Sequence, residues 1–341
     1  MTVKVGVLGY GYWGPNLVRN LAGLPSVKVR VVADPDAGRL KELDGNGLGT
    51  TTDWRRVLDD RAVDAVIIAT PAATHYQLAK AALLAQKHVL VEKPLAISSA
   101  ECRELIELAE RAHRTLMVGH TFLYNAAVRR LRDYVTSGEL GTVLYLYAQR
   151  LSLGRVRRDV NALWNFAPHD LSIILHLIGR KPVEVSARGF ACLQPGIEDV
   201  VFLTLAFEGG LGAHVHLSWL DPQKVRRMTV VGSRKMVVYD DVSLDAKLTV
   251  YDRGLDRVPT AESPRDFHGF AEFQLLQRIG DVVIPTLKFP EPLSVECAHF
   301  IECVEQGTPP LTDGPHGLQV VEILEAAQRS MARGGSPEAI R

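Results

Sequence analysis

The first third of the chain alternates between short apolar runs and amphipathic stretches. Four runs rich in valine, isoleucine and leucine stand there: Val3–Leu8, Val27–Ala33, Val63–Ala69 and Val89–Val91. Helical spacing of apolar residues follows them, for example over residues 76–86 and 99–112. Strands that are buried on both faces of a parallel sheet have this composition, because the crossover helices cover both faces. The pattern predicts an N-terminal α/β domain with a doubly wound parallel sheet.

From residue 142 onward the pattern changes to short strands separated by tight turns. The strand candidates are residues 142–152, 183–191, 200–207, 211–220, 228–232, 235–240 and 247–252. Glu208-Gly209-Gly210 and Gly232-Ser233-Arg234 are examples of the turns. Because a turn this short cannot carry a parallel crossover, we expect this half to be mostly antiparallel.

Helical spacing returns near the C-terminus, over residues 294–306 and 314–330. The stretch before it, residues 253–290, holds several prolines and predicts a long surface excursion or a dimer contact. Two domains are expected, with the boundary just after the Met117-Val118 run. The predicted domains are residues 1–123 and residues 124–341.

The composition narrows the class of partner. In 341 residues, 39 lysines and arginines balance 39 aspartates and glutamates. A protein that coats nucleic acid or an anionic membrane carries a basic excess, so we expect neither and predict a small-molecule ligand or a protein partner. The four cysteines form no C-x-x-C pair, and the residues before the first strand contain no basic segment and no cleavage site, so we expect no secretory signal. These features predict a reduced, cytoplasmic protein without a metal site.

A glycine-rich loop follows the first apolar run. Gly9-Tyr10-Gly11-Tyr12-Trp13-Gly14 is a G-x-G-x-x-G sequence between a strand and a helix. The first glycine of such a loop permits a tight turn, the second lets the backbone approach a pyrophosphate, and the third lets the helix pack on the strand. The first helical turn then faces the phosphates with the positive end of the helix dipole. We predict a dinucleotide site, with Tyr12 and Trp13 either shaping its nicotinamide end or simply packing.

Asp34 ends the second apolar run, 20 residues after Gly14. An acidic side chain at this position can accept hydrogen bonds from the adenosine ribose hydroxyls and would repel a 2′-phosphate. The prediction is therefore NAD in preference to NADP, although Arg39 lies close enough in sequence to keep NADP open. The alternative is that Asp34 only starts the turn Asp34-Pro35-Asp36.

Polar residues follow the third and fourth runs, at the strand ends where doubly wound sheets bind ligands. Ala69-Thr70-Pro71 precedes His75, and the fourth run leads into Glu92-Lys93-Pro94. A lysine at this edge can hydrogen-bond a reacting hydroxyl, stabilise the alkoxide and, if partly buried, join a proton relay. On the tripeptide alone a surface lysine is an equal alternative. We predict Lys93 as catalytic, with a cofactor bordered by Thr70, Pro71, His75 and Glu92.

Together these motifs resemble the glucose–fructose oxidoreductase/inositol dehydrogenase/MocA family over essentially the whole chain. The resemblance rests on the glycine loop with Pro15-Asn16, on Ala69-Thr70-Pro71 with His75, and on Glu92-Lys93-Pro94. Further matches to one sugar-modifying branch are Val118–Phe122, Asp159–Trp164, Ala167–Ser172 and Ser218–Pro222. The family implies a Rossmann domain followed by an α/β domain whose large open sheet commonly forms a homodimer or homotetramer interface. It also implies hydride transfer between a sugar or cyclitol carbinol and a nicotinamide, with Lys93 as the catalytic residue and a peptide before Pro94 that is often cis.

Many family members carry H-x-x-D-x-x-x-[HYW] on a helix beside the substrate, and this chain departs from that pattern. His169 and His176 occupy the outer positions, while Ser172 stands where the aspartate is expected. Spacings of three and four place these residues on one helical face. We predict His176 as the general acid/base and His169 as a substrate contact or alternative base, a structural histidine being the competing interpretation. Asp170 either partly replaces the missing carboxylate or caps the helix, and we predict both Asp170 and Ser172 as substrate contacts.

Two groups of basic residues are candidates for holding an anionic substrate. The stronger group precedes the His169 helix and consists of Arg155, Arg157 and Arg158, since guanidinium groups suit phosphate. The weaker group consists of Lys224, Arg226 and Arg227. For these residues a solvated turn is the preferred interpretation over an anion site.

The sequence thus predicts an NAD-dependent oxidoreductase acting on a secondary hydroxyl or ketone of a sugar. The branch resemblance implies a nucleotide sugar and a reaction at C3. Two alternatives stay open: an enzyme that cleaves glycosides through transient oxidation at C3, and a regulatory dinucleotide sensor without catalysis. The intact Glu92-Lys93-Pro94 favours an enzyme over a sensor.

Overall fold

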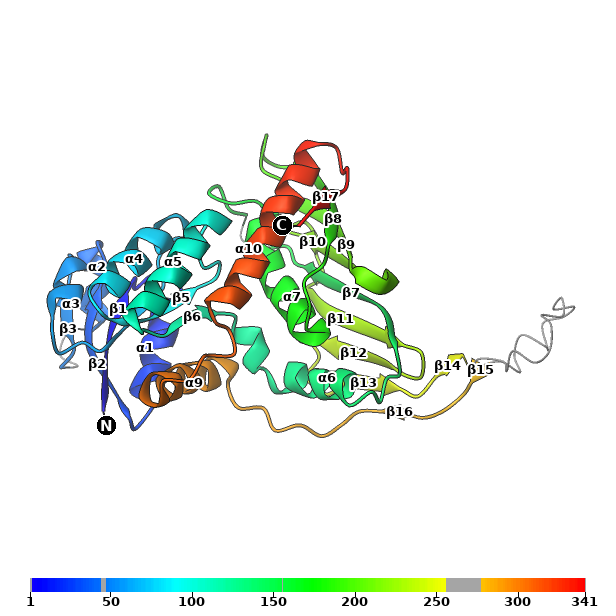
Figure 1. The fold of residues 1–341 in the computed structure, drawn as a ribbon, viewed down its shortest axis with the longest axis horizontal. Coiled ribbons are helices and arrows are strands. Elements are labelled where there is room, and N and C mark those ends of the chain that lie inside the picture. The colour runs from blue at the N-terminus through cyan, green and yellow to red at the C-terminus, as the bar shows by residue number, and fades with distance from the viewer. Residues whose placement is uncertain (1, 44–46, 155, 256–276, 341) are drawn as a thin grey trace, which may run out of the picture. The chain divides into compact units, whose positions relative to one another are not determined.

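The computed structural model describes residues 2–43, 47–154, 156–255 and 277–340. The chain forms two compact units (Figure 1): Met1–Asn125 with Phe289–Glu325, and Ala126–Lys288 with Ala326–Arg341. Each unit is built around its own sheet. In the described part of the chain, no helix is both long and apolar enough to cross a membrane.

The first unit contains a six-stranded parallel sheet with the order β3-β2-β1-β4-β5-β6. Its strands are β1 (Val3–Leu8), β2 (Val27–Ala33), β3 (Gly49–Thr51), β4 (Ala65–Ile68), β5 (His88–Glu92) and β6 (Leu116–Gly119). Every residue of β4 and β6 is buried, as a sheet covered on both faces requires. The strand order reverses between β1 and β4, which is where sheets of this type bind ligands.

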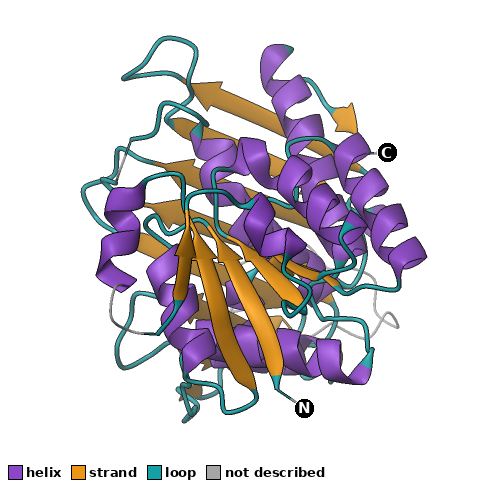
Figure 2. Cartoon of the chain, turned by 90° about the vertical axis from the view of Figure 1, so that its left-hand side faces the viewer, coloured by secondary structure: helices purple, strands orange, loops and turns teal. Residues whose placement is uncertain are grey.

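Helices connect the strands of the first unit, and Figure 2 shows them beside the fanned sheet. They are α1 (Gly14–Ala22), α2 (Ala37–Leu40), α3 (Arg55–Asp59), α4 (His75–Leu84) and α5 (Ser99–Ala112), with the 3-10 helices η1 (Lys41–Leu43), η2 (Ala72–Thr74) and η3 (Thr121–Tyr124). The start of α5 is fixed by Ser98, whose side chain accepts a hydrogen bond from the amide of Glu101.

Chain from beyond residue 288 returns to the first unit. Helix α9 (Pro292–Gln306) packs against α1 and η3, and α10 (Gly314–Ala332) begins in this unit and ends in the second. The predicted division at residue 123 placed this whole segment in the C-terminal domain. Helical spacing in a sequence indicates a helix but not the sheet on which it packs, so the return could not be predicted.

The second unit contains a nine-stranded sheet with the order β16-β13-β12-β11-β7-β10-β9-β8-β17. Its strands are β7 (Val143–Leu151), β8 (Glu184–Phe190), β9 (Val200–Ala206), β10 (Gly212–Ser218), β11 (Val225–Gly232), β12 (Met236–Asp240), β13 (Leu248–Tyr251), β16 (Val282–Val283) and β17 (Glu338–Ala339). Strands β7 and β10 are parallel, and the other neighbouring pairs are antiparallel. The predicted fold class is confirmed: a parallel Rossmann sheet is followed by a large, mostly antiparallel one.

The two faces of this second sheet differ. Helix α6 (Ala126–Thr136) packs on β12, and α7 (Ala162–Ile178) packs on β7, β9 and β10. Alternate side chains of β7 therefore point into a core, where Leu146 and Ala148 are buried. The residues that alternate with them, Tyr145 and Tyr147, are 49% and 37% exposed, and Phe202 on β9 is 37% exposed.

Within the predicted surface excursion over residues 253–290, residues 256–276 lie outside the described chain. On either side of this gap, β14 (Gly254–Leu255) and β15 (Gln277–Arg278) form a two-stranded antiparallel sheet. Strand β16 then joins the edge of the nine-stranded sheet beside β13. A further short 3-10 helix, η4 (Glu208–Gly210), forms the predicted turn between β9 and β10.

Candidate active site

The glycine loop has the geometry that a dinucleotide pyrophosphate requires. Gly9 has a φ of +97°, and a Cβ atom there would lie 2.6 Å from the carbonyl oxygen of Ala69. A Cβ atom on Gly14 would lie 2.3 Å from the carbonyl oxygen of Gly9, so α1 can approach the loop only because this residue is glycine. At Gly11 the space is open except for an Arg39 guanidinium nitrogen 3.5 Å away. The loop therefore fits a bound phosphate group at its middle glycine.

Asp34 at the end of β2 is only 2% exposed, and backbone amides occupy both of its oxygens. Oδ2 accepts from the amide of Tyr10 at 2.7 Å, and Oδ1 accepts from the amide of Asp36 at 2.9 Å. Arg39 places Nη1 3.4 Å from Oδ2. Asp34 therefore starts the turn that the alternative interpretation assigned to it, and it also anchors the glycine loop, which that interpretation did not include. Its contact with the ribose stays a prediction.

Tyr12 and Trp13 face different surroundings. Tyr12 is 85% exposed, whereas Trp13 immediately precedes α1 and its indole nitrogen is buried. The indole lies beside the carboxyl group of Glu92 but is not oriented to donate a hydrogen bond to it. Trp13 is therefore packed toward the end of β5, while Tyr12 is available at the surface.

His75 connects the end of β4 to the residue that follows Lys93. Its ring is 1% exposed, with Nδ1 2.7 Å from the carbonyl oxygen of Pro94 and Nε2 2.9 Å from that of Thr70. Burial lowers the pKa of His75 below its usual value, and the charge of Lys93 acts in the same direction. Thr70 is held in turn by a hydrogen bond of 2.7 Å from the Thr74 hydroxyl, across the turn that contains Pro71.

Lys93 follows directly after β5, at the carboxyl edge of the parallel sheet. The Lys93-Pro94 peptide is cis, and the Lys93 side chain is partly buried. Burial raises the pKa of the neighbouring Glu92 to about 7, although the charge of Lys93 lowers it. A lysine and a titrating carboxyl group thus stand together where a ligand of the sheet would bind.

A buried polar cluster near this edge was not predicted as part of the site. Thr121 at the start of η3 donates a hydrogen bond of 2.8 Å to Oε2 of Glu296, which is 0% exposed. The rings of His120 and His316 meet edge to face, with their centroids 5.4 Å apart. Thr121 and Glu296 are 175 positions apart, so local spacing in the sequence carries no signal for their contact.

His169 and His176 lie on α7 in the second unit, and both are partly buried. Ser172 between them is 0% exposed, and its hydroxyl donates to the carbonyl oxygen of His169 at 2.8 Å. The hydroxyl therefore donates within the helix, and the contact of Ser172 with substrate stays a prediction. The roles of the two histidines stay predictions.

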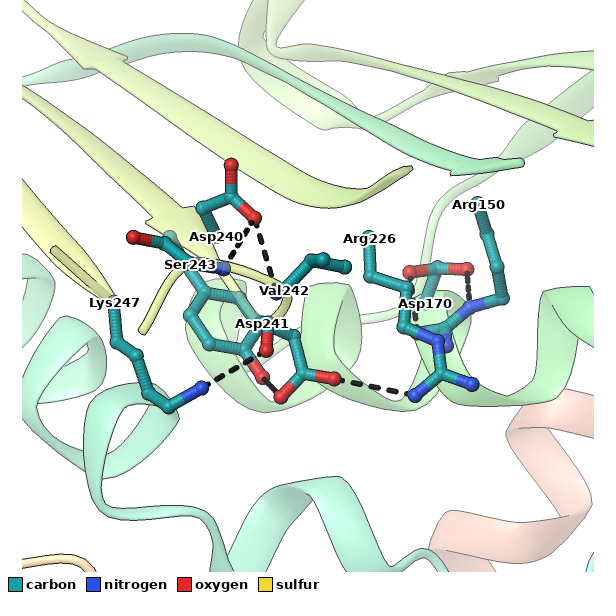
Figure 3. Close-up of polar contacts among 9 residues, drawn as sticks. Arg150, Asp170, Arg226, Asp240, Asp241, Val242, Ser243 and Lys247 are labelled. Atoms are coloured by element: carbon teal, nitrogen blue, oxygen red, sulfur yellow. Dashed lines mark hydrogen bonds and ion pairs between the residues drawn. The ribbon is translucent and has the colours of Figure 1, made fainter. Parts of the chain in front are cut away.

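Asp170 has a structural position inside the second unit (Figure 3). Arg150 on β7 donates to its two carboxylate oxygens at 2.7 and 3.0 Å, and the two residues are 5% and 4% exposed. Helix α7 is capped instead by Asn161, whose side chain accepts from the amide of Trp164. This geometry excludes Asp170 as the helix cap, while its contact with substrate stays a prediction.

The candidate anion-binding residues are largely engaged by acidic partners. Arg157 donates to both oxygens of Asp159 at 2.9 and 2.5 Å, and Arg158 is exposed. Arg155 lies outside the described residues. In the second group Lys224 is exposed, and Arg226 and Arg227 belong to β11 and not to a solvated turn. They pair with Asp241 at 3.3 Å (Figure 3) and with Asp240 at 2.7 Å.

The parallel sheet, its glycine loop and the lysine at its carboxyl edge define a dinucleotide-binding oxidoreductase. Residues 3–120 match the oxidoreductase family with an NAD-binding Rossmann fold, and residues 128–238 match the GFO/IDH/MocA C-terminal domain. The chain belongs to the GFO/IDH/MocA family of NAD-binding oxidoreductases.

Named relatives and a solved structure support this membership. The chain is 29% identical to UDP-N-acetylglucosamine 3-dehydrogenase from Acidithiobacillus ferrooxidans, over 76% of each chain. It is 30% identical to inositol 2-dehydrogenase 2 from Saccharopolyspora erythraea, over 64% of this chain and 67% of the relative. The crystal structure of a protein from Magnetospirillum magnetotacticum MS-1 superposes with a TM-score of 0.80 at 33% identity, covering 95% of this chain and 99% of the other.

Proposed function

We propose that the protein is an NAD-dependent dehydrogenase that interconverts a secondary alcohol and a ketone on a sugar, with a nucleotide sugar as substrate and C3 as the reacting carbon. The observation that carries the proposal is the position of Lys93, at the carboxyl edge of an NAD-binding sheet and next to the peptide braced by His75. The names of two relatives, one acting on a UDP-sugar and one on inositol, support a polyol ring as substrate.

Lys93 is the catalytic residue of this proposal. NAD, when bound, supplies the hydride chemistry. The Lys93 ammonium hydrogen-bonds the reacting oxygen and stabilises its developing negative charge, which lowers the barrier in either direction. In the oxidising direction the neutral amine of Lys93 takes up the hydroxyl proton, and in the reducing direction the ammonium returns it to the reacting oxygen; His176 or His169 on α7 is the alternative proton acceptor.

Gly9, Gly11 and Gly14 hold the pyrophosphate in this proposal, and Asp34 keeps their loop in place. Trp13 and Glu92 border the nicotinamide end. Among the arginines assigned to a nucleotide-sugar diphosphate, Arg158 is exposed while Arg157 is paired with Asp159, so Arg158 is the better candidate.

The decisive experiment combines binding and turnover. Thermal shift is measured with NAD⁺, NADH and a panel of UDP-sugars, dTDP-sugars, free sugars and inositols, and NADH formation is then followed with each compound that stabilises the protein. We expect stabilisation by a nucleotide sugar and a 3-keto product identified by NMR. Stabilisation by free sugars or cyclitols alone would overturn the nucleotide-sugar proposal.

The variant Lys93→Met tests the catalytic role of Lys93. It should keep the thermal shift with NAD⁺ and lose turnover by about 100-fold or more, as expected for loss of a general acid/base. Turnover at the wild-type rate would remove Lys93 from the mechanism. Release of free sugar without net NADH would instead indicate the glycoside-cleaving alternative.

A further inference from the structure

Glu296 is the most completely buried acidic side chain of the first unit. It lies on α9 with 0% exposure, and its Oε2 accepts the hydrogen bond from Thr121. Its Oε1 is also buried and has no hydrogen-bond partner among the described residues. An ionised carboxylate with one free oxygen is costly at such a position, whereas a neutral acid loses much less solvation.

The chain around Thr121 brings Glu296 into the neighbourhood of Lys93. Gly119 pairs in register with Glu92, and a Cβ atom on Gly119 would lie 3.2 Å from Oε2 of Glu92. Two residues further on, Thr121 holds Glu296. The stretch from 119 to 121 therefore lies beside both carboxyl groups, and the two groups repel each other when both are ionised.

The charge that acts on Glu296 is that of Glu92, whereas the Lys93 ammonium acts on Glu92 and on His120. Burial raises the pKa of Glu296 well above its usual value, and the charge of Glu92 adds to the effect. Burial lowers the pKa of His120 far below its usual value and that of His316 to about 4, so both rings are neutral at pH 7. On α9 itself, burial raises the pKa of the Cys297 thiol, which is neutral as well.

We propose that Glu296 is a positioning residue of the Lys93 site, whose carboxyl group stays protonated at neutral pH so that Glu92 is the carboxylate paired with Lys93. The link to Lys93 rests on the proposed function, but the protonation states do not. Glu296 acts through Thr121, which it fixes at the end of β6, and through its neutrality, which leaves Glu92 free to ionise.

Infrared pH titration tests the protonation of Glu296 without any substrate. The wild-type protein should show the carbonyl band of a buried protonated acid that persists at pH 8. Glu296→Gln should lack this band, and the matched variant Glu302→Gln, at an exposed position of the same helix, should retain it. Absence of the band in the wild-type protein, or its persistence in Glu296→Gln, would overturn the proposal.

Thermal and chemical unfolding provide a second readout. The folded protein keeps a proton on Glu296 that the unfolded chain releases, so the wild-type unfolding equilibrium should shift toward unfolding by up to about tenfold per pH unit above the usual carboxyl pKa. Glutamine does not titrate, so Glu296→Gln does not lose stability in this way as the pH rises. The stability of Glu296→Gln relative to wild type should therefore grow from pH 5 to pH 8, and a pH-independent difference would contradict the proposal.

The coupling to Lys93 is measured by labelling with acetic anhydride at a series of pH values, followed by mass spectrometry of the Lys93 peptide. Removing the negative partner in Glu92→Gln lowers the pKa of Lys93, and labelling at a given pH should become several-fold faster. Glu296→Gln should leave the labelling profile unchanged. An equal shift in both variants would show that Glu296 is ionised. Because no sugar is used, these results are independent of whether the proposed dehydrogenase activity is found.

Discussion

At the scale of single residues, His75 holds the chain next to Lys93 in place through its ring nitrogens. Replacing it with leucine removes both ring nitrogens that face the carbonyl oxygens of Pro94 and Thr70. We expect kcat to fall about 10- to 100-fold, because small displacements of a catalytic group are costly, with a smaller loss of affinity for NAD⁺ because His75 also borders the predicted cofactor site. Steady-state kinetics and NAD⁺ titration calorimetry measure the two effects.

The matched control for His75 is His88→Gln, at the other end of β5 from Lys93. His88 contacts the Thr115 hydroxyl at 3.1 Å, so this variant is expected to affect stability but not kcat. An equal loss of kcat in both variants would show that the effect of His75→Leu comes from general destabilisation.

The residues of the site differ in how far the sequence could predict them. The glycines and Lys93 were identifiable because a strand, a turn and a strand end are local features. For Asp34 the sequence indicated the position but not that amides of Tyr10 and Asp36 occupy its carboxylate. Glu296 could not be predicted, since its partner Thr121 is distant in the chain and buried acids follow no periodic pattern.

At the scale of elements, the Arg150–Asp170 pair joins β7 to α7, the helix that carries His169 and His176. Asp170→Asn leaves Arg150 buried without a full counter-charge, and the free energy of unfolding should fall by about 3–5 kcal/mol. Urea unfolding of the variant measures this loss.

The double variant Arg150→Met/Asp170→Leu separates the charge effect from packing. It removes both buried charges, so it should recover most of the stability lost in Asp170→Asn. Arg157→Met, which breaks an exposed ion pair with Asp159, is the matched control and should change stability by less than about 1 kcal/mol. Failure of the double variant to recover stability would mean that the pair contributes directional hydrogen bonds that apolar side chains cannot replace.

The sequence predicted which segments form strands better than it predicted which strands pair with each other. Alternation and tight turns indicated the strands β7 to β13, since they depend on residues close in sequence. Strands β3 and β17 contain three and two residues and are too short for a periodic signal. The parallel β7–β10 pair depends on which strands become neighbours, and spacing alone does not fix that choice.

At the scale of the whole molecule, buried histidines set the response of stability to acid. Burial lowers the pKa of His88 and His316 to about 4 and also lowers that of His75 and His120, whereas in the unfolded chain these groups titrate near 6.5. As pH falls from 6.5 toward 4, only the unfolded state binds these protons, so stability decreases. Glu92 and Glu296, with raised pKa values, act in the opposite direction.

The four histidines should outweigh the two carboxyl groups, and Tm should fall between pH 7 and pH 5. His316→Gln removes one of the histidine contributions, so its Tm should depend less steeply on pH, while Glu296→Gln should make the dependence steeper. Differential scanning calorimetry across this range checks the sign, and a Tm that rises on acidification would contradict the prediction.

The exposed face of the nine-stranded sheet is where we expect a second copy of the chain to bind. Tyr147 and Phe202 are each 37% exposed there, and His216 stacks on Phe202 with a centroid distance of 4.4 Å, so an aromatic surface faces away from α6 and α7. Burying it in a homodimer or homotetramer would remove apolar area from water, whereas two buried negative charges would oppose association.

The double variant Tyr147→Glu/Phe202→Glu should sediment as a monomer while the wild-type chain does not. Leu244→Glu adds a charge at a 90% exposed position between β12 and β13 and should leave the assembly intact. A wild-type protein that sediments as a monomer, or a double variant that keeps its assembled mass, would exclude this face as the interface.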